Sequence, residues 1–364
     1  MKLGIVGLPN VGKSTLFNAI THAHAESANY PFCTIEPNVG VVAVPDPRLE
    51  GMAKIFKPKK VTPASLEISD IAGLVAGASH GEGLGNQFLG HIREVDAILH
   101  LVRCFDDPNI INVYEEPDSR RDAEVVNLEL TLADLEHVER AVDRLAKAAK
   151  SGDPELRAQL ELWRELVEHL NGGQPARSFP PLREDPKSFA HLSLLTAKPV
   201  LYAANVNEDE VADPDSNPHV RALRELAAGT GAEVVVVSAA IEAEIALLPE
   251  EERHEFIAEL GLKESGLNRI ITAGYKLLGL ISFLTGGPTE VRAWTIRNGT
   301  PVQTAAGKIH SDMERGFIRA EVIKYDDLVA AGSYAMAREK GMMRIEGRDY
   351  IVKDGDVLHI RFNV

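Results

Sequence analysis

The sequence GIVGLPNVGKSTLFNAIT, residues 4–21, contains the pattern G-x-x-x-x-G-K-S, which runs from Gly7 through Gly12 to Ser14. A short apolar run at 3–6 precedes the pattern and a segment with helical periodicity follows it, which is the strand–loop–helix context that this motif requires. The glycines let successive backbone N–H groups point at an anion, beside a helix N-terminus whose dipole favours negative charge. The stretch therefore predicts a phosphate-binding loop (P-loop), and a chance glycine-rich turn is the weaker interpretation.

Two side chains at the end of this loop have chemical roles in such sites. Lys13 is expected to reach the β- and γ-phosphates and to stabilise the charge of the transferred phosphoryl group. The hydroxyl group of Ser14 is expected to bind Mg²⁺. The loop thus predicts a nucleoside triphosphate and its metal ion as the ligand.

Two motifs further along complete the expected phosphate site. Thr34 lies in a polar, turn-rich loop ahead of the β-branched run 39–44, where a threonine of switch proteins closes over Mg²⁺ and the γ-phosphate. Asp70 ends an expected strand at 65–69, and Gly73 follows it in the arrangement D-x-x-G. Asp70 is expected to hold Mg²⁺ through water, while Thr34 and the N–H group of Gly73 sense the γ-phosphate.

The residue that usually orients the attacking water is missing. The position after Gly73 carries Leu74, where Ras-like proteins carry glutamine, and an alkyl side chain cannot hydrogen-bond to water. His80 and Glu82, in the glycine-rich stretch 77–85, are candidates for this role, with simple solvation as the alternative. We therefore expect slow intrinsic hydrolysis, raised by a partner.

The base-recognition segment departs from the guanine-specific pattern N-K-x-D. An apolar run at 199–206 leads into Asn205, Val206, Asn207 and Glu208, so that valine replaces the lysine and the longer glutamate replaces the aspartate. Asn205 is expected to bridge back to the P-loop, whereas Glu208 would crowd a guanine. ATP is therefore expected in preference to GTP. The backbone of Ser238 and Ala239, which directly follow the apolar run 234–237, is also expected to line the base.

Several long stretches carry a family resemblance. NYPFCTIEPNVG (29–40), DIAGLVAGASHGEGLGNQFL (70–89) and NVNE (205–208), together with the P-loop, resemble the YchF-type, or Obg-like, ATPase family of translation-factor-class P-loop proteins. The likeness runs from residue 2 to 364. It implies binding of ATP in preference to GTP, a hydrophobic residue in place of the catalytic glutamine, and association with the ribosome.

The resemblance also assigns residues. It implies Mg²⁺ at Ser14 and Thr34, and a departure from the family pattern lies at Asn112, where some members carry a histidine proposed to assist hydrolysis. In relatives with the same loop pattern, the asparagine corresponding to Asn10 helps to bind K⁺, which supplies positive charge to the transition state; the alternative is that Asn10 only shapes the loop. The implied nucleotide contacts are Asn10, Val11, Gly12, Lys13, Ser14, Thr15 and Val206.

The chain is expected to fold as a mixed α/β protein with three parts. A Ras-like P-loop NTPase domain of parallel α/β type takes residues 1–120 and 190–278. Apolar residues recur every three or four positions from Val125 to Leu145 and again from Leu156 to Leu170, which predicts an antiparallel helical hairpin inserted at 121–189. Short expected strands around one helix at 279–364 resemble the TGS domain, a ubiquitin-like β-grasp module. Basic residues there form either an RNA-binding surface or scattered charges: Lys308, His310, Arg315, Arg319 and Lys324.

Composition limits the partners of the 364-residue chain. The net charge of −15 argues against extensive nucleic-acid coating, because phosphate neutralisation needs clustered Lys and Arg. Two cysteines make no disulfide framework, and no run of about 18 apolar residues predicts a membrane span, so a cytoplasmic location is expected. The expected function is a Mg²⁺-dependent, slow ATPase switch that associates with the large ribosomal subunit. A GTPase that tolerates Glu208 and a nucleotide-regulated binding module with negligible hydrolysis are the alternatives.

Overall fold

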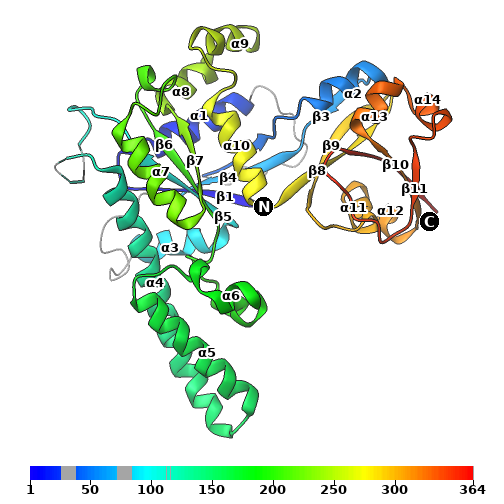
Figure 1. Cartoon of the computed structure of the whole chain (residues 1–364). Coiled ribbons are helices and arrows are strands. Elements are labelled where there is room, and N and C mark those ends of the chain that lie inside the picture. Colours follow the sequence, from blue (N-terminus) through cyan, green and yellow to red (C-terminus); the bar gives the residue numbers. More distant parts are fainter. Residues whose placement is uncertain (26–37, 72–83, 112, 115, 364) are drawn as a thin grey trace. The chain divides into compact units, whose positions relative to one another are not determined.

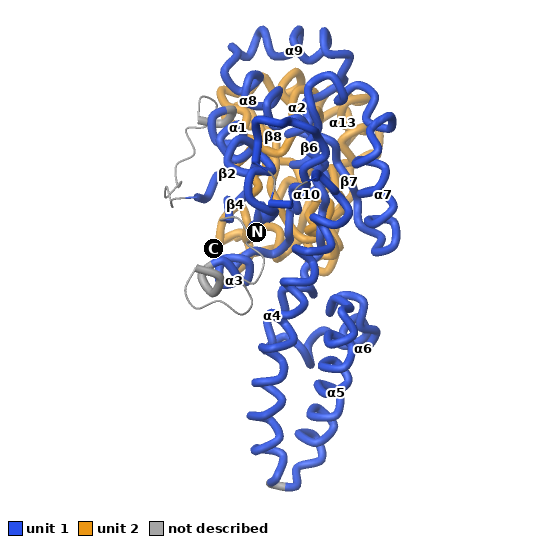
Figure 2. The backbone as a smooth tube through the Cα atoms, turned by 90° about the vertical axis from the view of Figure 1, so that its left-hand side faces the viewer, with its two compact units in different colours: residues 1–41, 67–274 blue, residues 42–66, 275–364 orange. Residues whose placement is uncertain are grey.

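The computed structural model describes residues 1–25, 38–71, 84–111, 113–114 and 116–363. The chain forms two compact units, which Figure 2 shows in different colours. The first unit contains residues 1–41 and 67–274, and the second contains residues 42–66 and 275–364.

The first unit is built on a six-stranded sheet with the order β2-β4-β1-β5-β6-β7. The pairs that join β4, β1, β5, β6 and β7 are all parallel. All residues of β5 and β6 are buried, as expected for strands covered on both faces. In such sheets the ligand site lies outside the carboxyl ends of the strands. The strands are β1 (Lys2–Val6), β2 (Val39–Ala43), β4 (Ser65–Asp70), β5 (Ala97–Arg103), β6 (Val200–Asn205) and β7 (Glu233–Val237).

Helices surround this sheet (Figure 1). They are α1 (Lys13–Ala25), α3 (Leu84–Glu94), α7 (Pro218–Thr230), α8 (Ala239–Leu247), α9 (Glu250–Glu259) and α10 (Gly266–Leu277), the last of which leads into the second unit. The helix α1 begins directly after the P-loop, and α8 begins directly after β7, so both helix N-termini lie at the carboxyl edge of the sheet. This is the parallel α/β architecture expected for the NTPase domain.

The predicted helical hairpin is confirmed. Two helices, α4 (Ser119–Ala148) and α5 (Pro154–Asn171), lie antiparallel and side by side (Figure 1). Asp118 and Asp153 start them, because each carboxylate accepts a hydrogen bond from a backbone N–H group in the first turn. The 3₁₀ helix Ala149–Ser151 lies in the turn between α4 and α5. Shorter helices follow α5 where the chain returns to the sheet: α6 (Pro180–Glu184) and the 3₁₀ helices Ala176–Ser178 and Pro186–Leu192.

The helix α4 is also joined to the body of the first unit. The Ser119 hydroxyl donates to the backbone oxygen of His219 over 2.7 Å. The fully buried Asp134 carboxylate accepts hydrogen bonds from the backbone N–H groups of Leu195 and Thr196, both at 2.8 Å. A single helix therefore contributes both to the hairpin and to the body from which the hairpin extends.

The second unit is built on a mixed sheet with the order β11-β10-β12-β8-β9-β3. The strands are β3 (Lys60–Thr62), β8 (Leu280–Gly286), β9 (Glu290–Arg297), β10 (Phe317–Lys324), β11 (Arg344–Glu346) and β12 (Asp356–Phe362). The first and last strands of the C-terminal part, β8 and β12, pair in parallel at the centre of the sheet, with α11 between β9 and β10 in the chain. This is the strand order of a β-grasp module. Its helices are α2 (Arg48–Phe56), α11 (Val302–Ile309), α12 (Ser311–Arg315), α13 (Tyr325–Ala331) and α14 (Tyr334–Glu339).

The segment 42–66 belongs to the second unit, although the sequence placed it within 1–120 of the NTPase domain. It contributes the edge strand β3, which pairs in parallel with β9, and the helix α2. Arg48 joins Asp46 and Asp354 through ion pairs of 2.7 and 2.8 Å. Since Asp354 and β9 lie more than 200 positions further along the chain than their partners in 42–66, no local pattern in this segment indicates these two contacts.

The fully buried His100 on β5 predicts a pH-dependent stability. Burial lowers the pKa of His100 from 6.5 to about 3, and the charges of Arg177 and Lys13 act in the same direction. Between those values the unfolded chain binds a proton that the folded chain does not, so stability falls as the pH falls below 6.5. We expect this group to lower the free energy of unfolding by about 2 kcal/mol between pH 7 and pH 5. Urea unfolding of the wild type and of His100→Gln at both pH values measures it, and parallel pH profiles for the two proteins would contradict it.

None of the helices in the described ranges is long and apolar enough to cross a membrane.

Candidate nucleotide site

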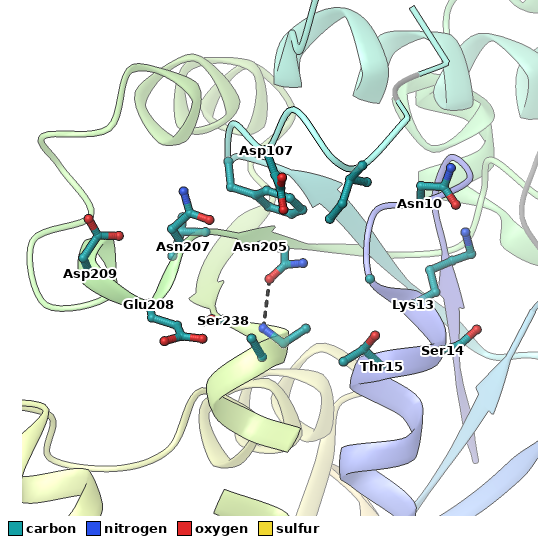
Figure 3. A pocket seen from close by; sticks show the side chains of 16 residues that line it. Asn10, Lys13, Ser14, Thr15, Asp107, Asn205, Asn207, Glu208, Asp209 and Ser238 are labelled. Atoms are coloured by element: carbon teal, nitrogen blue, oxygen red, sulfur yellow. Dashed lines mark hydrogen bonds between the residues drawn. The ribbon is translucent and has the colours of Figure 1, made fainter. Parts of the chain in front are cut away.

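A cavity of about 750 Å³ lies in the first unit at the carboxyl edge of its sheet (Figure 3). Figure 3 shows Lys13, Ser14 and Thr15 at one end of the cavity, and Glu208 and Asp209 at the other. The P-loop and the base-recognition segment thus contribute to one cavity. Its lining residues are Asn10, Gly12, Lys13, Ser14, Thr15, Phe105, Asp107, Ile110, Asn205, Val206, Asn207, Glu208, Asp209, Ser238, Ala239 and Ala240.

The backbone of the P-loop explains its glycines. Gly12 has a φ of 96°, and a Cβ atom there would lie 2.6 Å from Nδ2 of Asn205. A Cβ atom at Gly7 would lie 2.4 Å from the backbone oxygen of Leu101. Asn10 also has a positive φ of 63°, a conformation that asparagine tolerates better than most residues. Side chains at Gly7 and Gly12 would therefore displace neighbouring strands from the loop.

The Lys13 ammonium group lies folded over the loop that contains it. Its Nζ donates to the backbone oxygens of Gly7 and Leu8, at 3.0 and 2.6 Å. Burial lowers the pKa of Lys13 from 10.5 to about 8, against the opposing charge of Asp70. A triphosphate in the cavity would favour the charged form, so Lys13 is suited to bind anionic phosphate oxygens.

The oxygen atoms at the start of α1 and the end of β4 suit a magnesium ion. The Oδ1 atom of Asp70 is buried and has no hydrogen-bond partner within the described part of the chain. Burial raises the pKa of this carboxyl, and the charge of Lys13 opposes the effect. Ser14 lines the cavity on the first turn of α1. A hydroxyl and a carboxylate are the hard oxygen donors that Mg²⁺ prefers, so these residues fit the ion.

Asn205, at the end of β6, links the two ends of the cavity. Its Nδ2 donates to the backbone oxygen of Val11 over 2.9 Å. Its Oδ1 accepts from the N–H group of Ala239 over 2.9 Å, the bond dashed in Figure 3. The side chain is only 4% exposed, so both bonds are shielded from water. One amide group therefore fixes the P-loop relative to the start of α8.

The base end of the cavity is held by local hydrogen bonds. The N–H group of Asn207 donates to Glu210 over 3.1 Å, in the turn that forms the 3₁₀ helix Glu208–Glu210. The Asn217 side chain joins Glu210 to the backbone oxygen of Cys104 through bonds of 2.9 and 2.8 Å. Val206 and Glu208 line the cavity beside Ser238, which starts α8 by accepting from the N–H group of Ile241.

The structure adds lining residues that the sequence analysis missed. Phe105, Asp107 and Ile110 follow β5, and Asp209 and Ala240 extend the expected segments. The signal for the first three was available, because β5 is an apolar run beside the P-loop strand and the loop after such a strand borders the ligand site.

Several expected site residues lie outside the described part of the chain. These are Thr34, Gly73 and His80, together with Leu74, Glu82 and Asn112. Their roles stay predictions.

Comparisons with known proteins place the chain in a family. A protein-family model described as a 50S ribosome-binding GTPase matches residues 2–138. A second model, for the C-terminal part of YchF GTPases and described as a protein of unknown function, matches residues 280–363.

Two curated relatives and one solved structure match almost the whole chain. The ribosome-binding ATPase YchF of Bacillus subtilis (strain 168) is 56% identical over 361 residues, covering 99% of both chains. The protein of the same name from Escherichia coli O157:H7 is 54% identical, covering 100% of this chain and 99% of the relative. The structure of the Schizosaccharomyces pombe YchF GTPase is 38% identical with a TM-score of 0.89, covering 99% of this chain and 97% of that one. This chain belongs to the YchF family.

Proposed function

We propose that this chain is a Mg²⁺-dependent P-loop triphosphatase that prefers ATP to GTP and acts as a slow, nucleotide-controlled switch on the ribosome. The observation that carries the proposal is the cavity itself, in which Asn205 holds the P-loop next to a base segment that contains Glu208. Relatives that match over their full length are named ribosome-binding ATPases, which supports both the reaction and the partner. Association with ribosomes would place the chain in the cytoplasm.

The base preference follows from what lines the far end of the cavity. Guanine-specific sites carry an aspartate that accepts two hydrogen bonds from the base, and this site carries the longer Glu208, with Val206 in place of the usual lysine. The extra methylene group leaves less room for guanine. Adenine would bind through backbone groups of Ser238 and Ala239 and through Asn207.

We assign roles in phosphate and metal binding to residues at the P-loop end of the cavity. Lys13 would stabilise the transferred phosphoryl group, and Ser14, Thr34 and Asp70 would hold the metal ion. Bound Mg²⁺ would neutralise charge on the β- and γ-phosphate oxygens. Gly73 and Thr34 would sense the γ-phosphate. With Leu74 in place of the glutamine, His80 is the candidate for orienting water, and turnover by the bare chain would be slow.

Asn10 is the candidate for a potassium site. Its Nδ2 donates to the backbone oxygen of Ile111 over 3.1 Å. The amide oxygen is therefore the atom of this side chain that would bind the ion, and K⁺ there would add positive charge near the phosphates.

We also propose contact with the large ribosomal subunit, including RNA, through the TGS-like second unit. A groove of about 330 Å³ there is lined by three arginines, Arg319, Arg338 and Arg361, together with Glu321, Met343 and Ile345. Of the basic residues expected from the sequence, only Arg319 lines this groove. The other four lie elsewhere in the second unit: Lys308 on α11, His310 at the start of α12, Arg315 on α12 and Lys324 at the end of β10.

A hydrolysis assay and a competition-binding experiment test the proposal. Phosphate release from ATP and from GTP is measured with and without large ribosomal subunits, in K⁺ and in Na⁺ buffers. We expect slow release by the bare chain, on the order of 10⁻³ s⁻¹, and faster release with the subunits and with K⁺. In competition binding, ATP should displace GTP.

Each contrary result points to a different conclusion. Rapid hydrolysis by the bare chain would contradict the slow switch, and tighter binding of GTP would indicate a GTPase. Tight nucleotide binding without any phosphate release would indicate a regulatory binding module. Equal rates in K⁺ and Na⁺ would remove the potassium site.

A further inference from the structure

Arg103, the last residue of β5, is a buried arginine beside the nucleotide cavity. Only 3% of its surface is exposed, and it is not among the residues that line the cavity. Its guanidinium group donates to three backbone oxygens: Nε to Phe105 over 3.1 Å, and the two terminal nitrogens to Asp107 over 3.0 Å and to Ile110 over 3.1 Å. Its charged end is thus directed at one short segment of chain.

The three acceptors are the three residues of that segment that line the cavity. The guanidinium carbon also lies 4.6 Å from the centroid of the Phe105 ring, within the range of a cation–π contact. Phe105 is the one aromatic residue among the described residues that line the cavity. Arg103 therefore contacts the backbone of all three of these lining residues and also the ring of Phe105.

In the described part of the chain, the other polar contacts of the segment 105–110 are one of 3.9 Å between the Asp106 carboxylate and the His219 ring, and those within the segment. Within it, the N–H group of Ile110 donates to Asp107 over 3.2 Å, and the N–H group of Asn109 donates to the Asp107 carboxylate over 2.8 Å. These are local turn contacts, which shape the segment but do not fix it to the sheet. Arg103 makes that connection, because it belongs to a central buried strand.

We propose that Arg103 is a positioning residue for nucleoside recognition: it holds the wall formed by Phe105, Asp107 and Ile110 in place for the purine and ribose of the bound nucleotide. The P-loop supplies the N–H groups and the ammonium group that bind the phosphates, and Arg103 contacts neither of them in the described structure. The apolar surfaces of Phe105 and Ile110 offer binding to a purine and none to phosphate oxygens. The proposal rests on the proposed function, because it requires that the cavity binds a purine nucleotide.

The test compares ligands with and without a nucleoside. Affinities for ATP and for inorganic tripolyphosphate, each with Mg²⁺, are measured by calorimetry for the wild type, Arg103→Gln and Arg103→Lys. We expect Arg103→Gln to weaken ATP binding by about tenfold or more and to change tripolyphosphate binding by less than about twofold. Arg103→Lys keeps a cation but loses the fork of donors, so its ATP affinity should lie between the other two.

Arg121→Gln is the matched control. Arg121 also places its guanidinium carbon over an aromatic ring, 4.5 Å from the centroid of Tyr114, and also donates to a backbone oxygen, that of Glu116. None of these residues lines the cavity, so the variant should bind both ligands as the wild type does.

Unchanged ATP affinity in both Arg103 variants would overturn the proposal. An equal loss of ATP and tripolyphosphate binding would overturn it as well, because that result indicates a general structural role. If Arg103→Gln does not fold, as judged by circular dichroism, Arg103→Lys decides by the same criterion. A wild type that binds tripolyphosphate but no purine nucleotide would overturn the proposed function itself, and this inference with it.

Discussion

Replacing Lys13 with alanine is expected to lower kcat/KM for ATP hydrolysis by about 10²-fold or more. Lys13 is the one lysine among the described residues that line the cavity. Its ammonium group donates hydrogen bonds to two backbone oxygens of the P-loop. When a triphosphate binds, the same donors become available to the β- and γ-phosphates, whose charge shifts in the transition state. Steady-state phosphate release, with and without ribosomal subunits, measures the loss.

The stability of the variant separates a catalytic effect from unfolding. Because burial already lowers the pKa of Lys13 to about 8, the charged ammonium group is costly in the nucleotide-free protein, and its removal should destabilise that form little. The increase in melting temperature caused by Mg²⁺ and ATP should shrink instead.

Lys198→Ala is the control for this prediction. The Lys198 ammonium group, on a half-buried side chain, likewise donates to two backbone oxygens, those of Arg93 and Val95, but it does not line the cavity. We expect this variant to keep wild-type kcat. Hydrolysis by Lys13→Ala within about twofold of the wild-type rate would refute the assigned role.

The cavity residues that the sequence analysis named are those in contiguous motifs, and the structure brings these motifs together around one cavity. The P-loop needs glycine where neighbouring atoms approach its backbone closely, as the Asn205 side chain approaches Gly12. The glycines of the motif therefore indicate the geometry of the loop. The segment from Asn205 to Glu208 was recognisable because its position after a buried strand fixes its place at the edge of the sheet.

Other parts depend on contacts that no local pattern encodes. The edge strand β3 joins the second unit by pairing with β9, which lies more than 200 residues further along the chain. No pattern near β3 reveals so distant a partner. Arg103 binds the backbone oxygens of Phe105, Asp107 and Ile110, and every residue type has such an oxygen, so the sequence of the loop does not reveal the contact. Distant pairing and backbone recognition are thus what the sequence analysis missed.

Asn205→Ala is expected to lower the free energy of unfolding by about 2–4 kcal/mol, because it leaves two buried partners without a hydrogen bond. These partners are the backbone oxygen of Val11 and the N–H group of Ala239. Loss of the bridge also frees the P-loop from α8, so ATP affinity should fall by at least about tenfold. Urea unfolding and calorimetric titration measure the two effects. Asn127→Ala is the control, since it removes one partly buried bond, to the Tyr202 hydroxyl, away from the cavity.

Asn205→Asp tests whether the bridge needs a donor at one end and an acceptor at the other. Aspartate keeps an oxygen for the N–H group of Ala239, but it places its second oxygen where Nδ2 lies 2.9 Å from the backbone oxygen of Val11. Two acceptors at that distance repel each other, and the carboxylate is also buried, so this nearly isosteric change should lower ATP affinity at least as much as alanine does. Wild-type affinity in Asn205→Asp would show that the P-loop does not depend on this donor. The phosphate and base ends of the cavity would then be positioned independently.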